Sequence, residues 1–490
     1  MILVWLMIIL FVGGIAAWLA EGRSAELPKV IALFSIGLDL VLVVLMLLTP
    51  STLGLAQEGE WLVLLNAEWI PRFGISVIFA ADGLTLLLIF LTIFLGLMSL
   101  GSAWHEIKER SGFFYFNLLW TLAGVIGVFT ALDLFLFFFF WEIMLIPMYF
   151  IIAVWGHENK EYAAMKFFIF TQVSGLLMFL AIMALVFFHQ QDSGEISFSY
   201  FALLDTDIPE PFAFLVMLGF FIAFATKLPA VPFHAWLPDA HSQAPTPGSV
   251  ILAGILLKTG AYGLIRFAIP LFPEESLAFA PTAMMIGAIS ILYAAKVAFG
   301  QNDLKRLIAY TSVSHMGFVL LGIYAWNIQA VQGAIMTMLA HGFSAAALFM
   351  LAGGLQYRIH TRNMDEMGGL AAIVPKMSFM ALFFTVAAVG MPGLGNFIGE
   401  FLVLLGSFKV NILTTAFATL GLILAAVYSL IVIQKVFHGE NKNQLSCTDL
   451  TRIEMYCFSL MMIGLIWMGM YPQTMLDLAA PTLQSLNIGN

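Results

Sequence analysis

The sequence predicts an all-α polytopic membrane protein with about 14 transmembrane helices. Of the 490 residues, 61% are hydrophobic and only 10% are charged, and the mean hydropathy is +0.98. Soluble domains average about 45–50% apolar and about 25% charged residues. Apolar runs of roughly 20 residues, the length that crosses a bilayer, recur along the whole chain between charged or Pro/Gly-rich breaks.

The first half of the chain contains seven of these runs. The first has no basic segment before it and is followed by many others, so we interpret it as a retained helix rather than a cleaved signal. Asp133 is a suitable first residue for the fifth helix. The runs cover residues 1–20, 29–49, 84–103, 113–130, 133–154, 167–189 and 213–235.

The second half contains the other seven runs, and the distribution of Lys and Arg orients the whole set. The runs cover residues 250–270, 280–299, 306–324, 330–354, 377–406, 412–434 and 455–475. Alternate loops hold 14 basic residues, and the opposite loops hold 3, which are Arg72, Arg266 and Lys409. Because cytoplasmic loops are rich in Lys and Arg, we expect both termini on the periplasmic side of a bacterial inner membrane. The 14 are Arg23, Lys29, Lys108, Arg110, Lys160, Lys166, Lys305, Arg306, Arg358, Arg362, Lys376, Lys435, Lys442 and Arg452.

The composition excludes several classes of function. Acidic residues outnumber basic ones by 29 to 20, and no basic stripe could neutralise phosphates, so nucleic-acid binding is excluded as the main task. The only cysteines, Cys447 and Cys457, argue against a disulfide scaffold or a thiolate metal centre. No dinucleotide fingerprint or convincing pair of haem histidines is present. We therefore expect no cofactor on this chain.

Glu142 is a charged residue deep inside an apolar run. It lies nine residues beyond Asp133, which places it about 13 Å into the fifth helix at 1.5 Å per residue. A charge at the bilayer centre costs roughly 2.5–3.5 kcal/mol on insertion scales. A structural ion pair that locks two helices is one interpretation, and a proton-carrying carboxylate is the one that we favour.

Two predicted helices are interrupted beside an ionisable residue. Lys227 ends an apolar run directly before Pro229 and Pro232, and Glu400 follows the segment Met391–Gly399, which is rich in Gly. Proline breaks helices, and non-helical backbone at membrane depth is tolerated only inside protein or beside a wet cavity. Transporters build ion sites from such discontinuous helices. Snorkelling of Lys227 to the membrane surface is the alternative.

Further ionisable residues lie inside other runs. We expect a functional role for Lys258, with a structural ion pair as the alternative, and a relay role for His315 and His341. Lys296 lies near a helix end, where snorkelling is the favoured interpretation. We expect two more histidines, His234 and His241, near the cytoplasmic mouth of the Pro-rich stretch, and their participation stays open.

This set of groups suits proton transfer. At about 4 Å and an effective dielectric of about 20, a Glu–Lys pair interacts by roughly 4 kcal/mol. A change in the charge of one group therefore alters the proton affinity of its neighbour by orders of magnitude. Because the chain has no site for an electron carrier, we infer that it moves protons with energy supplied from elsewhere.

Three motifs resemble one protein family, the antiporter-like subunits of respiratory complex I and of multi-subunit sodium/proton antiporters. The most specific is Lys227–His241 with Ala244–Thr246. The motifs together span residues from about 113 to 410, and a weaker likeness to the bacterial form lies at Trp69–Ser76. The other two are Ala131–Leu136 with Phe140–Glu142 and Pro147–Tyr149, and Asp303–Ser312 with Ser314–His315.

The resemblance implies a fold of two inverted five-helix repeats. The corresponding divisions are 1–112 for the first three helices, 113–271 and 272–436 for the repeats, and 437–490 for the last loop and helix. It also implies other membrane subunits of complex I as partners, especially two sister antiporter-like subunits, with NADH, FMN, Fe–S clusters and quinone in other subunits. Position 400 is Glu where the sisters usually carry Lys, and the chain ends at Asn490 without the lateral helix of the largest sister.

The resemblance also implies residue roles. Glu142 and Lys227 would form a coupled input pair, and Lys258 would be the central proton carrier. His315 and His341 would extend the polar axis to Glu400 at the exit or at a neighbouring subunit. Two alternatives remain, a cation/proton antiporter subunit without a redox partner and a passive scaffold. The costly mid-membrane charges disfavour the scaffold.

Overall fold

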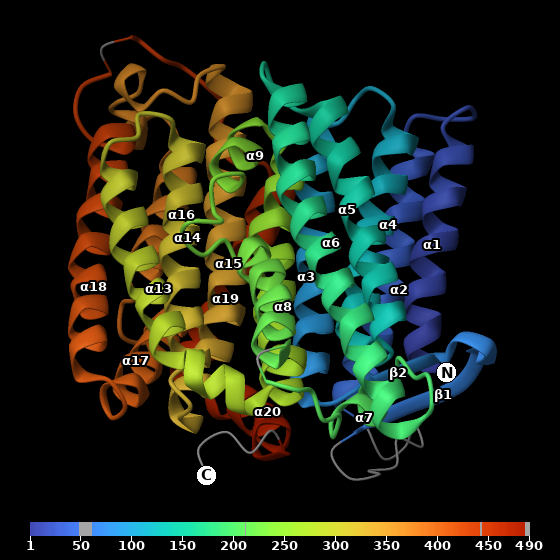
Figure 1. The fold of residues 1–490 in the computed structure, drawn as a ribbon. Coiled ribbons are helices and arrows are strands. Elements are labelled where there is room, and N and C mark those ends of the chain that lie inside the picture. The colour runs from blue at the N-terminus through green and yellow to red at the C-terminus, as the bar shows by residue number, and fades with distance from the viewer. Residues whose placement is uncertain (49–60, 211, 442, 486–490) are drawn as a thin grey trace.

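Helices that lie side by side make up most of the molecule (Figure 1). The computed structural model describes residues 1–48, 61–210, 212–441 and 443–485. In this part of the chain, 12 helical segments are long and apolar enough to cross a membrane. Eleven are, or begin with, the helices α1 (Ile2–Ala20), α2 (Leu27–Leu48), α3 (Gly83–Glu106), α4 (Ser111–Thr130), α5 (Leu134–Trp155), α6 (Lys160–Ser193), α13 (Pro273–Phe299), α14 (Leu304–Ile323), α15 (Ile328–Ile359), α18 (Ile412–Val432) and α19 (Arg452–Met470).

The remaining long segment carries Lys258 and is not a uniform α-helix. Thr246–Leu271 is wholly buried within its most apolar stretch. It consists of α10 (Thr246–Ile251), the π-helical turn η2 (Leu252–Leu256), α11 (Leu257–Gly263), the π-helical turn η3 (Leu264–Ala268) and α12 (Ile269–Leu271). A third π-helical turn, η6 (Ile433–Phe437), extends α18. Such turns occur frequently at functional sites.

Both predicted helix interruptions are present. The run 213–235 is helical only as far as Lys227, where α8 (Phe212–Lys227) ends, and α9 (Leu237–Gln243) follows after a turn. The run 377–406 is divided into α16 (Pro375–Ala388) and α17 (Gly395–Phe408). Proline in the first case and glycine in the second explain the breaks, because Pro229 and Pro232 cannot donate to a helix and Gly390 and Gly393 have positive φ.

The predicted all-α class holds for the membrane-spanning part, but the chain also contains a β-hairpin that its sequence did not predict. Strands β1 (Val63–Ile70) and β2 (Ile75–Ala81) pair antiparallel. The hairpin packs against the start of α5, since Leu132 N donates to Ile78 O at 2.9 Å and Ser76 N donates to the Asp133 carboxylate at 2.9 Å. This stretch lies between the predicted runs 29–49 and 84–103, and its apolar segments are shorter than the length that predicts a membrane helix.

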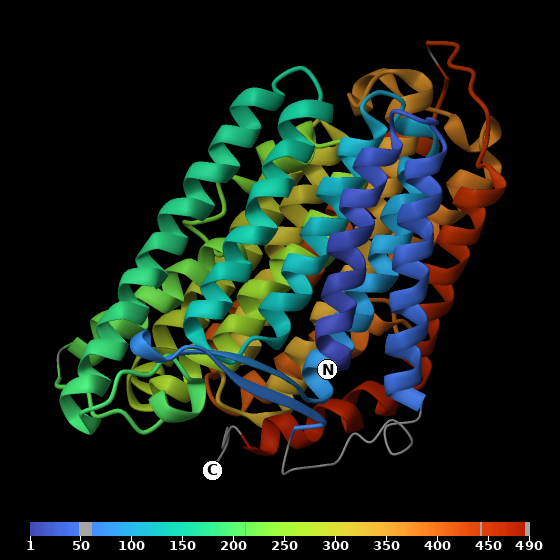
Figure 2. The same ribbon diagram turned by 90° about the vertical axis from the view of Figure 1, so that its right-hand side faces the viewer.

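A C-terminal amphipathic helix was also missed. Helix α20 (Gln473–Ser485) lies across one end of the bundle, on the same side as the hairpin (Figure 2). It is too short and polar to cross a membrane. The other short helical segments are α7 (Tyr200–Leu203), η1 (Pro71–Phe73), η4 (Met364–Glu366) and η5 (Leu370–Ala372).

The chain begins at the same end of the molecule as α20 (Figure 1). The Lys- and Arg-rich segments between α1 and α2, α3 and α4, and α5 and α6 lie at the opposite end. This arrangement agrees with the alternation of basic loops. Which end faces the cytoplasm, the number of crossings, the domain divisions and the inverted repeats stay predictions. Residue 49, Lys442 and residues 486–490 lie outside the described chain.

Aspartates fix the starts of three helices in the core. Asp133 caps α5 by accepting from Phe135 N and Leu136 N, both at 3.0 Å, which confirms it as the helix start. Asp82 caps α3 through Thr85 N, and Asp303 caps α14 through Arg306 N. An N-cap contributes about 1 kcal/mol, so these residues stabilise the point at which each helix begins.

Candidate functional site

Lys227, the last residue of α8, and Glu142 on α5 interact electrostatically beside the first helix interruption. The Lys227 ammonium is 1% exposed and has no hydrogen-bond partner among the described residues. It lies 5.3 Å from the centroid of the Trp141 ring and 5.5 Å from that of Phe167. Glu142 follows Trp141 on α5, accepts a hydrogen bond from Gln172 of α6, and interacts electrostatically with Lys227. The two therefore form a coupled acid–base pair inside the protein.

Lys258 is completely buried in the middle of its segment. Its ammonium donates to the backbone oxygen of Ala253 at 2.6 Å and lies 2.8 Å from Nδ1 of His341 on α15. Ala253 belongs to the π-helical turn η2, whose wider backbone pairing turns the carbonyl toward the lysine five residues later. The local distortion thus holds the ammonium directed at the histidine.

Further ionisable side chains extend the Lys258–His341 contact as far as Glu400. The rings of His315 and His341 have centroids 5.6 Å apart, and Nδ1 of His315 lies 2.7 Å from Oε1 of Glu400. The Nε2 atoms of both histidines are buried and have no partner in the described chain. Four ionisable side chains from α11, α15, α14 and α17 therefore form one buried row.

The structure brings the six predicted residues together in two groups. Glu142 and Lys227 form the first group, and Lys258, His341, His315 and Glu400 form the second. Within the described residues no hydrogen bond links Lys227 to Lys258. Lys296 lies on the exposed surface near the end of α13, in agreement with the snorkelling interpretation.

Lys305 was wrongly assigned to a loop by the charge count. It lies in the first turn of α14 with 0% exposure, and its ammonium is 3.2 Å from both the Ala244 oxygen and Nε2 of His157. Its charge also interacts with Glu106 of α3. The Asp–Leu–Lys–Arg motif contained this residue, but the motif does not reveal that the lysine faces inward.

His157, in the loop between α5 and α6, lies beside Lys305 of α14. Burial, together with the cationic side chains of Lys305 and Arg362, lowers the pKa of this imidazole to about 3. His157 is therefore neutral, and its Nε2 is available to accept a proton from the lysine.

His241 lies between Lys305 and the central row. It is completely buried, its ring stacks on Phe349 with centroids 4.4 Å apart, and neither ring nitrogen has a partner among the described residues. It interacts electrostatically with Lys305 and with Lys258. Its position near the cytoplasmic mouth of the Pro-rich stretch stays a prediction.

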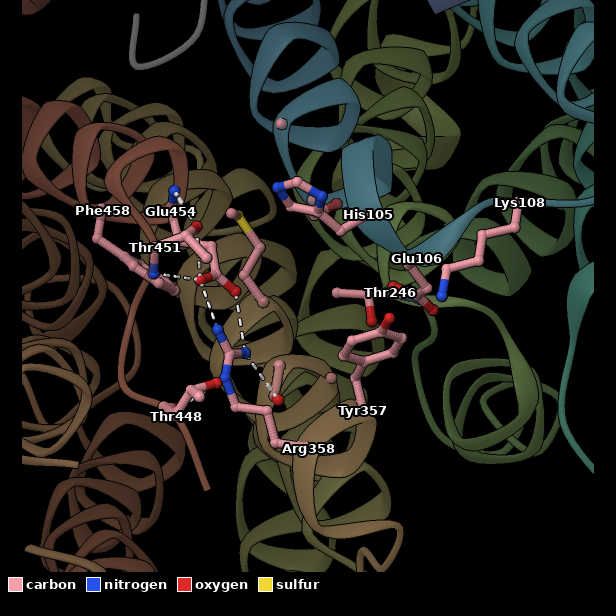
Figure 3. Close-up of a pocket in the computed structure, with 15 residues that line it drawn as sticks. His105, Glu106, Lys108, Thr246, Tyr357, Arg358, Thr448, Thr451, Glu454 and Phe458 are labelled. Carbon is pink, nitrogen blue, oxygen red and sulfur yellow. Dashed lines mark hydrogen bonds and ion pairs between the residues drawn. The ribbon is translucent and has the colours of Figure 1, made fainter. Parts of the chain in front are cut away.

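Two polar cavities open at the basic end of the molecule. One of about 320 Å³ lies beside Glu106, Thr246 and Tyr357, and Figure 3 shows the ion pair of Arg358 and Glu454 among its lining residues. A second cavity, of about 580 Å³, shares Glu106 and Thr246 and is lined by His157. Together they bring a polar opening to the residues around Lys305.

Arg266 was likewise wrongly assigned to a loop. It is 1% exposed inside the Thr246–Leu271 segment and forms an ion pair with Asp82, the cap of α3. A cation at the end of a long apolar run looks the same in sequence whether it faces water or protein. Within the described residues, no group of three or more His, Cys, Asp or Glu side chains could hold a metal ion.

Comparisons with known proteins agree with this architecture. The family model described as NADH:quinone oxidoreductase/Mrp antiporter, TM, matches residues 131–425. NADH-quinone oxidoreductase subunit M from Pseudomonas aeruginosa is 51% identical, over 99% of this chain and 97% of its own length. The subunit M of Escherichia coli strain K12 is also 51% identical, over 97% of this chain and 96% of its own.

Solved structures support the same assignment. A chain of respiratory complex I from Thermus thermophilus with bound NADH superposes with a TM-score of 0.88 at 31% identity, covering 99% of this chain and 100% of that chain. A chain of the Mrp complex from Dietzia has the same fold, with a TM-score of 0.84 at 20% identity over 100% of this chain and 52% of that one. The chain therefore belongs to the NADH:quinone oxidoreductase/Mrp antiporter transmembrane family.

Proposed function

We propose that this chain is a proton-translocating membrane subunit of an NADH:quinone oxidoreductase, of the subunit M type that is also called chain 4. The observation that carries the proposal is the buried row from Lys258 through His341 and His315 to Glu400. The full-length identity of 51% with subunit M relatives supports the redox-driven complex, and Glu400 favours subunit M over its sisters. Electron transfer would take place in other subunits that hold NADH, FMN, Fe–S clusters and quinone.

The row has the atoms needed to pass a proton without net change. The Lys258 ammonium gives a proton to Nδ1 of His341, which then releases one from Nε2. The two ring centroids are 5.6 Å apart, and a water molecule would carry the proton between the rings. His315 accepts at Nε2 and passes its Nδ1 proton to Glu400. After one transfer each histidine holds its proton on the other ring nitrogen and Glu400 is protonated. The row is reset when Glu400 releases its proton, both rings return to their first tautomer and Lys258 is reprotonated.

The Glu142–Lys227 pair would control when Lys258 gives up its proton. Two charges at about 4 Å interact by roughly 4 kcal/mol at an effective dielectric of about 20. Separation of the pair by a signal from the redox subunits would expose Lys258 to the positive charge of Lys227. The other membrane subunits, including the two sister antiporter-like subunits, would deliver that signal, and the repeats would supply matching halves of the path.

A cation/proton antiporter without a redox partner is the second candidate. The likeness to the Mrp complex favours it only at the level of fold, because the identity is 20%. Sodium-dependent proton movement by the isolated assembly, without NADH, would support this candidate against the first. A passive scaffold does not explain why four ionisable groups are aligned in the interior.

The decisive experiment uses inverted bacterial inner-membrane vesicles that contain the complex with Glu142→Gln. We expect NADH-driven acidification to be lost and coupled NADH–quinone turnover to fall, while the amount of assembled subunit stays normal. Glu161→Gln, an exposed glutamate in the first turn of α6, is the matched control and should behave like the unaltered complex. Unchanged acidification with Glu142→Gln would remove Glu142 from the path, and loss of assembly would favour the structural ion pair.

A further inference from the structure

A buried arginine–aspartate pair lies at the end of the Lys258 segment that is remote from the basic loops. Arg266 and Asp82 are each 1% exposed and form an ion pair. Asp82 also accepts Thr85 N at 2.9 Å, so its two oxygens are both engaged. Arg266 follows Lys258 by eight residues, about 12 Å along a helix.

The space between Lys258 and Arg266 is filled by aromatic side chains. Tyr262 lies one turn from each, packs against Phe129 with ring centroids 5.2 Å apart, and donates its hydroxyl to the Phe129 backbone oxygen at 2.8 Å. Phe137 and Phe267 pack with centroids 4.5 Å apart beside them. All four rings are completely buried, so the described residues of this layer leave no opening to solvent, and the Tyr262 hydroxyl is engaged by its neighbours.

The far side of the pair is covered as well. The Arg266 guanidinium lies 4.8 Å from the centroid of the Trp61 ring, and Trp61 itself is 8% exposed. Trp61 lies two residues before β1, which is at the α20 end of the molecule. The guanidinium therefore stands between the Lys258 region and that end of the protein.

An arginine in this position blocks protons for two physical reasons. Its guanidinium does not lose its proton in proteins, so it cannot relay one. Its positive charge also repels protons, as fixed cations do in selective pores. A proton carrier must prevent direct passage between the two sides of the membrane, and the basic end already has polar cavities that lead toward Lys305.

We propose that Arg266, held by Asp82, is the proton barrier beneath Lys258. It closes the direct route along the Lys258 segment and leaves the row through His341 and His315 to Glu400 as the way out. This inference rests on the proposed proton translocation, but it assigns a role to two residues that take no part in the transfer itself. Arg266 carries the barrier, and Asp82 is a positioning residue.

The test measures passive proton leakage, which requires no NADH oxidation. The whole complex is reconstituted in liposomes, an acid step is imposed with potassium and valinomycin to clamp the voltage, and the decay of the pH difference is followed with the quinone site inhibited. We expect Arg266→Gln to collapse the pH difference several-fold faster than the unaltered complex. Arg266→Lys keeps the cation and should stay tight, whereas a purely packing role would make both variants leak.

Two further variants complete the test. Arg72→Gln removes an exposed arginine at the same end of the molecule and should leave the decay unchanged. Asp82→Asn retains the Arg266 cation, and the amide oxygen can still accept a hydrogen bond from the guanidinium, so this variant should also stay tight. An assembled Arg266→Gln complex with unaltered decay would overturn the proposal, as would a leaky Asp82→Asn complex.

The proposal can also be tested if the Arg266→Gln variant prevents assembly of the complex. If Arg266→Gln does not assemble, the neutral double variant Arg266→Gln with Asp82→Asn takes its place, and a tight complex would then refute the barrier. The outcome is independent of the pumping test. Normal acidification with Glu142→Gln would refute the proposed path, whereas the decay measurement judges Arg266 whether or not that path is correct.

Discussion

At the scale of single residues, the 2.7 Å contact between His315 and Glu400 is the most specific feature of the central row. A hydrogen bond to a charged group contributes roughly 1.5–3 kcal/mol. We expect Glu400→Gln to lower the ratio of protons pumped to NADH oxidised by about tenfold, because an amide cannot take up the proton from His315. The measurement is vesicle acidification and NADH oxidation recorded together. Glu440→Gln, at an exposed site, is the control, and an unaltered ratio for Glu400→Gln would remove Glu400 from the path.

His157 gives the protein a defined pH dependence. Burial, with the charges of Lys305 and Arg362, lowers its pKa from 6.5 to about 3. The unfolded chain therefore binds a proton below about pH 6.5 that the folded protein refuses, so this site lowers stability progressively as the pH falls from 7 toward 4. We expect His157→Gln to flatten the fall in melting temperature of the detergent-purified complex over this range. An equally steep fall in the variant would contradict the assignment.

Single residues also show where sequence reasoning fails. Glu142, Lys227, Lys258 and Glu400 stand out because a charge inside an apolar run is costly wherever the helix packs. Lys305 and Arg266 do not stand out, because each lies at the end of a run, where a cation ordinarily reaches water. Their burial depends on the neighbours that cover them, and these neighbours are distant in sequence.

At the scale of elements, the two interrupted helices position the site. The gap between α16 and α17 places Gly390, with φ +83°, directly against Glu400, and a Cβ at this position would lie 2.9 Å from Oε2 of Glu400. A non-glycine residue at positive φ costs about 1–3 kcal/mol. The glycine thus serves both the turn and the close approach of the carboxylate.

We expect Gly390→Ala to impair pumping in addition to lowering stability, because the methyl group displaces the Glu400 carboxylate. Gly194→Ala is the matched control, since Gly194 ends α6 with φ +80° and a Cβ there would meet nothing within 4 Å. Both variants should lower the melting temperature by similar amounts. Normal proton pumping by an assembled Gly390→Ala complex would show that the interruption does not position Glu400.

The interruptions could be predicted from sequence, whereas the hairpin and the π-helical turns could not. Proline removes a backbone donor in any context, so a helix break at Pro229 follows locally. The turn at Leu252–Leu256 contains no such residue. Its wider pairing is held by side chains of other helices, including His341, through the Lys258 ammonium.

At the scale of the whole molecule, the alternation of basic loops predicts the orientation in the membrane. We expect Ser24→Cys, between α1 and α2, to be labelled by an impermeant maleimide from the cytoplasmic side. Ser193→Cys is at the last residue of α6, at the opposite end of the molecule from Ser24. It should be labelled only from the periplasmic side. Both sites are exposed, and Cys447→Ser provides the background, because the remaining Cys457 is 6% exposed. Inverted vesicles and spheroplasts distinguish the two sides, and a reversed pattern would refute the orientation.

The sequence by itself determined that this is a polytopic membrane protein, where its apolar runs lie, where two helices break and which six ionisable residues carry the proposed chemistry. Each of these depends on a local physical cost, either of exposing apolar surface or of burying a charge. Only the tertiary structure decided which groups meet. Lys258 and His341 are 83 residues apart and His315 and Glu400 are 85 apart. Such contacts depend on how helices rotate and pack against one another. The same packing buries Lys305 and places Arg266 beneath Lys258.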